Sequence, residues 1–176
     1  MIAMFVLSRD QTAQAVLPFD KNQFADELAK QQINQLYYSG QTGAGDELAL
    51  SAQSAVEGFD GQKTLEMRAV IASIKGKNGF EIEATAQFGQ YLYSEKLLKM
   101  TGAVLISSSS GYKLSSPELR ILTDGTYIFG EGPIEGLSPV GKIYAGRMEI
   151  TRKNSRAPMQ LWFGEKVVLD YEPSEI

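Results

Sequence analysis

Residues 97–121 read LLKMTGAVLISSSSGYKLSSPELRI and contain two strand patterns joined by a polar turn. Four apolar residues of the first half share one parity: Leu98, Met100, Val104 and Ile106. This alternation with a period of two is typical of a β-strand that buries one face. The serines and the glycine at 108–111 are turn-forming residues, so the segment predicts two antiparallel strands joined by a tight connection.

The second strand pattern changes parity in its middle. Leu114 and Ser116 share one parity, whereas Leu119 and Ile121 take the other. Because a slip of one residue turns every later side chain to the opposite face, this change predicts a bulge or a corner within the strand. Pro117 stands at the change, where a missing backbone donor is tolerated.

The same pair of patterns occurs four times along the chain. Segments of the corner type begin at Leu50, Ile82, Leu114 and Ile143, which are 32, 32 and 29 residues apart. Segments of the alternating type begin at Leu65, Leu98, Ile128 and Leu161, which are 33, 30 and 33 residues apart. The repeating unit therefore has about 32 residues, two strands and two turns. Without helical crossovers, such units predict an all-β, elongated roll of antiparallel strands.

Composition excludes several classes of function. The 176-residue chain has a formal charge of −4, which provides no electrostatic footprint for nucleic acid. It has no cysteine and no histidine, so thiolate or imidazole metal sites and Ser-His-Asp triads are excluded. Glu81 and Glu83 share one strand face, which leaves a carbohydrate-acting enzyme as an alternative, although exposed solubilising charges explain the pair better. We therefore expect no catalytic residues, no metal and no cofactor.

The N-terminal 32 residues differ from the rest. Residues 1–10 begin with seven apolar residues, too few to cross a bilayer, and are interpreted either as a frayed apolar start or as the remnant of a membrane anchor or leader. Residues 11–32 form a linker, with a short helix expected over about 22–31. The β-roll is expected over 33–171 and a tail over 172–176.

Inward-pointing apolar residues define the candidate site. These residues form either an ordinary packed core or an apolar slot between two walls that do not fully close. Ala84 and Leu169 are expected on the same inward-pointing face. The residues expected to line it are Leu65, Met67, Ile71, Ile82, Phe88, Leu98, Met100, Val104, Ile106, Leu114, Ile128, Ile134, Ile143, Leu161, Phe163 and Val167.

Small residues recur along the same lining, where they would leave room between the walls or allow them to pack closely. They are Ala52, Ala84, Gly102, Ser116, Gly130, Gly132 and Ala145.

The last strand, expected over 160–171, would form an exposed sheet edge. Such an edge is either covered by a β-strand partner or blunted by Lys166 and Asp170.

Several of these segments resemble a known family. The corner segments YKLSSPELRI and GKIYAGRMEI, the strands LLKMTGAVLI and TYIFGEGPIEG, and the closing LWFGEKVVLDY are similar to LptC, the periplasmic component of the lipopolysaccharide export (Lpt) machine. The entry segment LPFDKNQFADELAKQQINQLYYSGQTGAGDELALSAQSA also resembles the region that follows the membrane anchor in this family. The resemblance covers about residues 17–171, and the sister family LptA shares the repeat.

The resemblance implies a twisted β-jellyroll of the OstA/LptA type that holds the acyl chains of lipopolysaccharide. It implies a periplasmic protein anchored in the inner membrane in its full-length form. The family's N-terminal end docks on the periplasmic domains of an inner-membrane ABC transporter, here at about 33–39 and 47–56, through Leu36, Tyr38, Leu48 and Leu50. Its C-terminal end pairs with an LptA-like bridge protein, here at about 160–171, through Trp162 and Val168.

Two other functions remain as alternatives. One is a soluble LptA-like bridge protein. The other is a structural β-roll interaction module with a dry core and no lipid cargo. The helical entry segment and the apolar start favour the anchored LptC type, because a soluble bridge protein would begin with a cleavable signal.

Overall fold

The computed structural model describes residues 33–42, 45–59, 63–76, 79–123, 127–152 and 157–171. The expected helix over 22–31, the anchor or leader remnant at 1–10 and the tail at 172–176 lie outside these residues. The described elements are all strands: β1 (Ile33–Gln41), β2 (Glu47–Phe59), β3 (Lys63–Lys75), β4 (Glu81–Leu92), β5 (Leu97–Ser108), β6 (Lys113–Leu122), β7 (Tyr127–Ser138), β8 (Gly141–Arg152), β9 (Met159–Gly164) and β10 (Val168–Tyr171).

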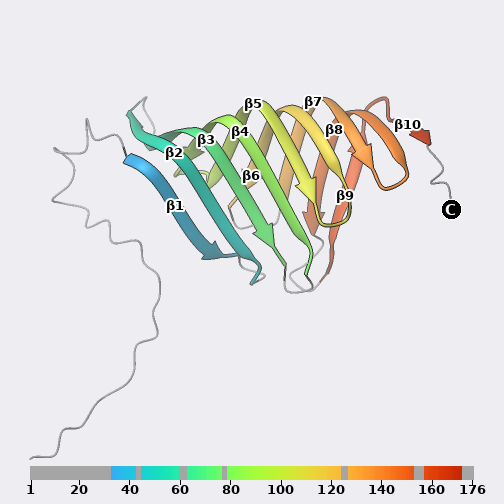
Figure 1. The fold of residues 1–176 in the computed structure, drawn as a ribbon. Helices are drawn as coiled ribbons and strands as arrows, with labels where there is room; N and C mark the ends of the chain where they lie inside the picture. Colours follow the sequence, from blue (N-terminus) through green and yellow to red (C-terminus); the bar gives the residue numbers. More distant parts are fainter. Residues whose placement is uncertain are drawn as a thin grey trace, which may run out of the picture.

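The strands form one antiparallel sheet in which each pairs with its neighbour along the chain, from β1 to β8. Figure 1 shows the resulting elongated array, with β1 at one end and β10 at the other. At the far end β8 pairs with two short strands, β9 along its second half and β10 along its first half. The all-β fold and the repeating pair of strands are confirmed.

Alternate strands bend at a corner marked by left-handed backbone. Positive φ angles occur at Gln35 in β1, at Ala69 in β3, at Gly102 and Ala103 in β5, and at Gly132 in β7. The neighbouring strands change parity at the same level, as the patterns around Pro117 and Gly146 predict. The corners therefore line up across the sheet and fold it lengthwise.

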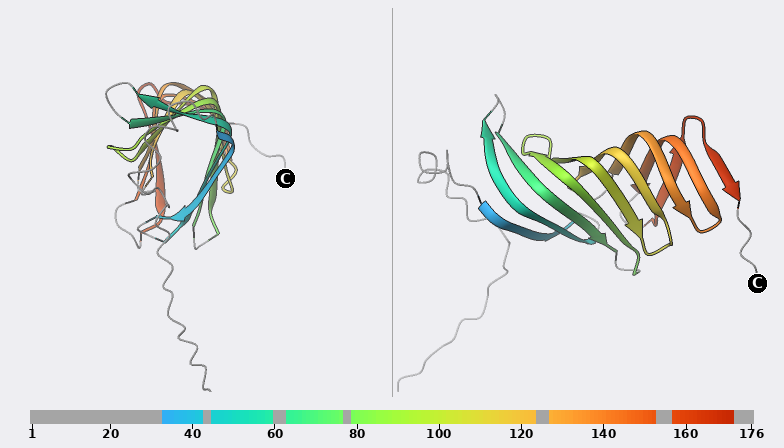
Figure 2. Two further views of the ribbon diagram at one scale, coloured as in Figure 1. Left: turned by 90° about the vertical axis from the view of Figure 1, so that its left-hand side faces the viewer. Right: turned by 45° about the horizontal axis from the view of Figure 1, so that its top comes forward.

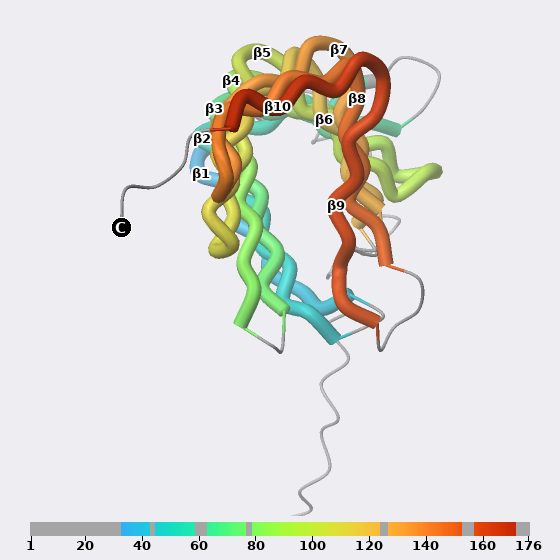
Figure 3. Tube along the Cα trace, turned by 90° about the vertical axis from the view of Figure 1, so that its right-hand side faces the viewer, coloured from blue at the N-terminus to red at the C-terminus, as the bar shows by residue number. Residues whose placement is uncertain are grey.

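The folded sheet has two walls, which we call wall A and wall B. Wall A contains residues 47–52 of β2, 70–75 of β3, 81–86 of β4, 104–108 of β5, 113–116 of β6, 134–138 of β7 and 141–145 of β8, with β10. Wall B contains the other halves of these strands, with β9. Viewed end-on, the walls form an arch whose roof is the row of corners (Figures 2 and 3).

The corner of β3 corrects the expected orientation of Ile71. In β5 the corner takes two residues, so Leu98 and Val104 keep one parity on either side of it. In β3 the corner takes the single residue Ala69, so the buried side chains after it are Val70 and Ala72. Ile71 is 43% exposed on the outer surface. The expectation that it lines the interior is wrong, because it assumed a corner of the β5 type.

The predicted orientation of Phe88 is wrong for a related reason. The corner of β4 lies at Gln87, opposite Ala69 of β3, and after it the interior receives Gly89. Phe88 is 48% exposed, and its ring lies under the guanidinium of Arg68, 5.9 Å from the ring centroid to Cζ. The expectation that Phe88 points inward is therefore wrong.

The expected single strand over 160–171 is in fact β9 and β10. The chain leaves β9 after Gly164, turns with positive φ at Glu165 and Lys166, and crosses to wall A as β10. Val167 lies in this corner and is 47% exposed, so it does not line the interior. Leu169 pairs with Ile143 and so shares its inner face, but as part of the last strand it is left half exposed.

Two glycines lie among large side chains along the inside of the roof. The register places Met67, Gly89, Met100, Leu119, Gly130, Met148 and Phe163 in one row across the strands. A Cβ at Gly89 would lie 2.8 Å from Cγ2 of Val70, and one at Gly130 would lie 3.3 Å from Cε of Met148. The glycines thus allow the methionines to pack tightly between the walls.

Two of the small residues expected inside lie on the outside. A Cβ at Gly102 would lie 3.0 Å from Cβ of Gln87, and one at Gly132 would lie 2.6 Å from Cγ of Pro117. Both neighbours are exposed. These glycines therefore belong to the outer surface of the corners, where neighbouring strands approach closely, and the expectation that they line the interior is wrong.

Replacing Gly132 by alanine is expected to lower the free energy of unfolding by about 1–3 kcal/mol. The residue has a φ of 100°, and the added methyl group would overlap the ring of Pro117. The matched control is Gly79→Ala, because Gly79 has a φ of 83° but, among the described residues other than its chain neighbours, no atom lies within 4 Å of the added carbon. Urea unfolding of both variants separates steric overlap from backbone strain, and equal losses would contradict tight corner packing.

Candidate functional site

One apolar cavity lies between the walls near the N-terminal end of the roll. Its volume is about 300 Å³, and its lining is overwhelmingly apolar. Wall A and β1 contribute Ile33, Leu36, Tyr37, Tyr38, Leu48, Leu50 and Ala72. Wall B and its turns contribute Leu65, Tyr91, Tyr93, Leu98, Ile121 and Thr123. We call this space the N-terminal cavity.

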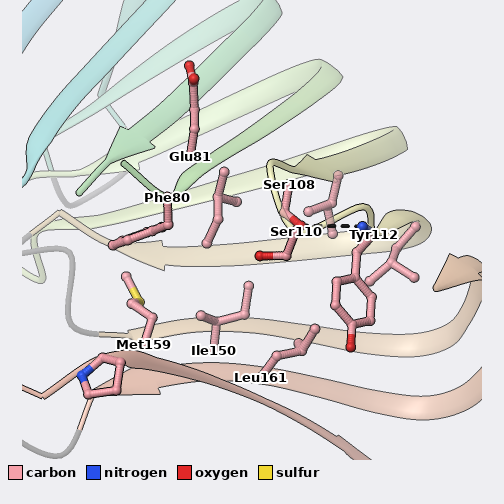
Figure 4. Close-up of a pocket in the computed structure, with 12 residues that line it drawn as sticks. Phe80, Glu81, Ser108, Ser110, Tyr112, Ile150, Met159 and Leu161 are labelled. Carbon is pink, nitrogen blue, oxygen red and sulfur yellow. Dashed lines mark hydrogen bonds between the residues drawn. The ribbon is translucent and has the colours of Figure 1, made fainter. Parts of the chain in front are cut away.

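A second cavity of about 250 Å³ lies further along the roll (Figure 4). Phe80 and Tyr112, from the turns of wall A, face Ile150, Met159 and Leu161 of wall B across it. The ring of Tyr112 also lies 6.3 Å, centroid to centroid, from that of Phe163 in β9. We call this space the C-terminal cavity.

The roof between the two cavities is densely packed. Met100, Val104 and Met148 are 0% exposed there, and Leu119 and Ile134 are nearly as deeply buried. The interior is therefore a packed roof with apolar space beneath it, bounded by two walls of a single repeating sheet.

A model of the LptC-related family, described as lipopolysaccharide-assembly, matches residues 42–160. The chain belongs to this LptC-related family. The match runs from the turn before β2 to the beginning of β9 and includes every complete bent strand from β2 to β8. A comparison with individual curated proteins found no significant match. Membership places this LptC-related protein in lipopolysaccharide transport in general.

Most of the residues expected to line the slot of the LptC-related chain lie inside the arch. The fully buried ones are Met67, Ile82, Leu98, Met100, Val104, Ile106, Leu114, Ile128, Ile134 and Ile143. Leu65, Leu161 and Phe163 are half-buried and pack against them. The three exceptions are Ile71, Phe88 and Val167, for the reasons given above. Contact of any of these residues with lipid stays a prediction.

Sequence reasoning omitted several lining residues. Tyr91 and Ile121 face the N-terminal cavity, and Tyr112 and Met159 face the C-terminal one. Tyr91 follows the corner of β4, so applying the parity change at Gln87 would have found it. Met159 precedes the expected last strand, and no local pattern indicates its position.

The residues expected to contact partner proteins occupy two different environments. Leu36, Tyr38, Leu48 and Leu50 line the N-terminal cavity and therefore face the interior of the roll. Trp162 and Val168 are each 57% exposed on the outer surface at the other end.

The described residues contain no helix long and apolar enough to span a bilayer, and no cluster of three or more potential metal-binding side chains.

The outer surface of wall B carries an ion-pair network. Lys99 and Arg120 lie directly opposite each other in β5 and β6, where like charges repel. Glu118 compensates both: its carboxylate accepts a hydrogen bond of 2.7 Å from Nε of Arg120 and lies 3.0 Å from Nζ of Lys99. Burial alone would raise the pKa of Glu118, but hydrogen bonds from Lys99 and Arg120 outweigh it and lower the pKa below 4.5.

Replacing Glu118 by glutamine is expected to cost about 1 kcal/mol of unfolding free energy at neutral pH. Because the folded-state pKa is lowered, the stabilisation is fully present above the ordinary carboxyl pKa and is lost as the pH falls through the lowered value. Denaturant unfolding of both proteins as a function of pH should show two stability curves that converge in acid. A difference independent of pH would contradict the ionic origin of the effect.

Lys63 places a positive charge near the rim of the N-terminal cavity. Its Nζ lies 2.8 Å from Oε1 of Glu57 and 5.4 Å from the ring centroid of Tyr93, which lines that cavity. The hydrogen bond with Glu57 raises the pKa of Lys63, and burial raises that of the Tyr93 hydroxyl. At neutral pH the rim therefore presents an ammonium group and a neutral phenol.

Proposed function

We propose that the protein binds the acyl chains of lipopolysaccharide between its two walls and passes the molecule along the roll. The single observation that carries this proposal is the pair of apolar cavities between the walls of an LptC-related chain. Both are lined by residues from wall A on one side and wall B on the other. An acyl chain placed there is shielded from water without any covalent chemistry.

The physical requirement is the transfer of hydrocarbon through an aqueous space. Each exposed methylene group costs about 0.8 kcal/mol in water, so a lipid with several chains does not leave a membrane unaided. A channel of apolar side chains removes most of that cost. The energy for transport would come from the transporter.

The ends of the roll support a position between two partners. Within the described residues, β1 pairs only with β2 and β10 only with β8, so both ends of this sheet present unpaired backbone groups. Such edges accept another β-strand by augmentation. In this proposal the N-terminal end receives lipopolysaccharide from the periplasmic domains of the inner-membrane ABC transporter. The C-terminal end, with exposed Trp162 and Val168, delivers it to an LptA-like bridge protein.

This assignment places the protein in the periplasm and tethers it to the inner membrane in its full-length form. The support is family membership alone, because residues 1–32 lie outside the described structure.

Photo-crosslinking tests the proposed cargo. A photoreactive amino acid at Leu65 in the N-terminal cavity, or at Leu161 in the C-terminal one, is expected to capture lipopolysaccharide on irradiation. The matched controls are the next residues, Glu66 and Trp162, which lie on the outer surface and should capture none. Half-buried Leu65 and Leu161 are chosen because fully buried positions would not accommodate the probe.

The result separates lipid transport from a structural role. Capture at both inner positions but at neither control supports the proposal. Capture only at the outer positions, or none at any position in a protein that folds, would favour a β-roll module without lipid cargo.

A further inference from the structure

A buried ion pair joins two distant parts of the roll. Nη2 of Arg152 lies 2.7 Å from Oδ2 of Asp46, and the two side chains are only 6% and 4% exposed. Asp46 ends the turn before β2, and Arg152 ends β8. These strands are six steps apart in the sheet, a lateral distance of about 29 Å in a flat sheet. The contact exists because the twisted arch brings the end of wall A to the end of wall B.

The pair lies on the inner side of the arch, between the two cavities. Asp46 is two residues from Leu48, which lines the N-terminal cavity, and Arg152 is two residues from Ile150, which lines the C-terminal cavity. Ile150 and Arg152 both belong to β8, and residues two apart in a strand point to the same side. Arg152 also pairs with Met159 of the C-terminal cavity. The two charges thus meet on the side of the arch opposite the corners. We call this side, the lower side of the trace in Figure 3, the mouth.

The geometry of the pair is incomplete. The contact does not have hydrogen-bond geometry at Oδ2 of Asp46, and Nε of Arg152 is buried without a hydrogen-bond partner among the described residues. A buried ion pair offsets its desolvation cost only when its geometry is good and the remaining polar atoms are satisfied. Separation would return both charges to water, so the contact is poised to open.

Asp46 is nevertheless held firmly on its own side. Its backbone N–H donates to Oγ1 of Thr42 at 3.2 Å, and its carbonyl accepts from the N–H of Thr42 at 2.9 Å. These hydrogen bonds hold the backbone of Asp46, so opening of the ion pair would not require Asp46 to leave Thr42.

We infer that Asp46 and Arg152 form a latch across the mouth, which must open for lipid to enter the interior and which, when open, joins the two cavities. This inference rests on the proposed function. Asp46 and Arg152 are positioning residues for lipid loading. The latch controls whether the walls admit an acyl chain, and the two residues do not need to contact the lipid.

A reversible staple tests the latch in the full chain. The protein has no cysteine, so Asp46→Cys with Arg152→Cys introduces the only two thiols. A short bis-thiosulfonate reagent then joins the walls, and dithiothreitol releases them. With the photoreactive residue at Leu161, the stapled protein is expected to lose capture of added lipopolysaccharide, and reduction is expected to restore it.

The matched control staples neighbours within wall A. Thr85 and Leu105 lie directly opposite each other on the outer surface of β4 and β5, so Thr85→Cys with Leu105→Cys links strands that already pair. This control should capture lipid with or without the staple. Equal capture by the stapled and the reduced latch variant would overturn the latch but leave the proposed function standing. Absence of capture in the reduced variant and in the control would overturn both.

Charge variants provide a second measurement if the staple forms poorly. Asp46→Arg places two like charges at the mouth and is expected to load lipid severalfold faster than the wild type. The reciprocal exchange, Asp46→Arg with Arg152→Asp, restores the attraction and should return the loading rate toward that of the wild type. Identical loading rates in all three proteins would contradict the latch.

Discussion

Replacing Met100 by alanine is expected to lower the free energy of unfolding by about 2–5 kcal/mol. Met100 is 0% exposed and lies in the middle of the roof, directly opposite Gly89 on one side and Leu119 on the other. The walls are joined by continuous backbone pairing and have little freedom to collapse onto a missing side chain. The variant therefore loses both buried apolar area and packing contacts, and leaves a cavity. Urea unfolding followed by circular dichroism measures the loss.

The control for this variant is Leu105→Ala in the same strand. Leu105 is a similar apolar residue, but it is 57% exposed on the outer face of β5. Its truncation should change the unfolding free energy by no more than about 0.5 kcal/mol. If Met100→Ala cost no more than this control, the roof would not be the packed centre of the molecule.

Replacing Ala72 by phenylalanine is expected to weaken lipopolysaccharide capture in the N-terminal cavity by at least about tenfold, equivalent to 1.4 kcal/mol. Ala72 lies on wall A with its side chain in the cavity lining. The cavity of about 300 Å³ provides room for the ring, so overpacking strain should be small. The ring would occupy the space proposed for an acyl chain. Photo-crosslinking from Leu65, with lipopolysaccharide titrated, measures the effect.

Ser73→Phe is the matched control for the cavity-filling variant. Ser73 is the next residue in β3 and points to the opposite face, so the same ring is added outside the roll. Capture by this control should equal that of the wild type. Equal loss in both variants would indicate a general disturbance of β3, and unchanged capture in Ala72→Phe would show that the cavity holds no lipid.

The local sequence pattern was sufficient to predict the fold and many of the residues in the interior. The alternation of Leu98, Met100 and Val104 identified a half-buried strand, because successive side chains in a pleated strand point to opposite faces. The parity change between Ser116 and Leu119 predicted a corner, and β6 bends there. Both signals are properties of a few adjacent residues, so they can be recognised without knowing what packs against them.

Errors arose where the number of residues in a corner differs between strands. β5 uses two residues at its corner and β3 uses one, which turned Ile71 outward. Nothing in the composition around Ala69 indicates a left-handed backbone, because alanine rarely adopts one. The corner lies level with that of β4, because Arg68 pairs with Phe88 and Val70 with Ala86 on either side of it.

The sequence by itself determined that this chain is a repeating array of bent antiparallel strands with an apolar interior and no histidine or cysteine chemistry. Periodicity and composition are properties of the sequence alone. Backbone geometry determines from the periodicity which side chains share a face, and from the turn-forming residues where the chain reverses. The tertiary structure alone decided where the two cavities lie and that Asp46 meets Arg152. Those features depend on the twist accumulated over six strand-to-strand steps, which brings together residues that no local pattern relates.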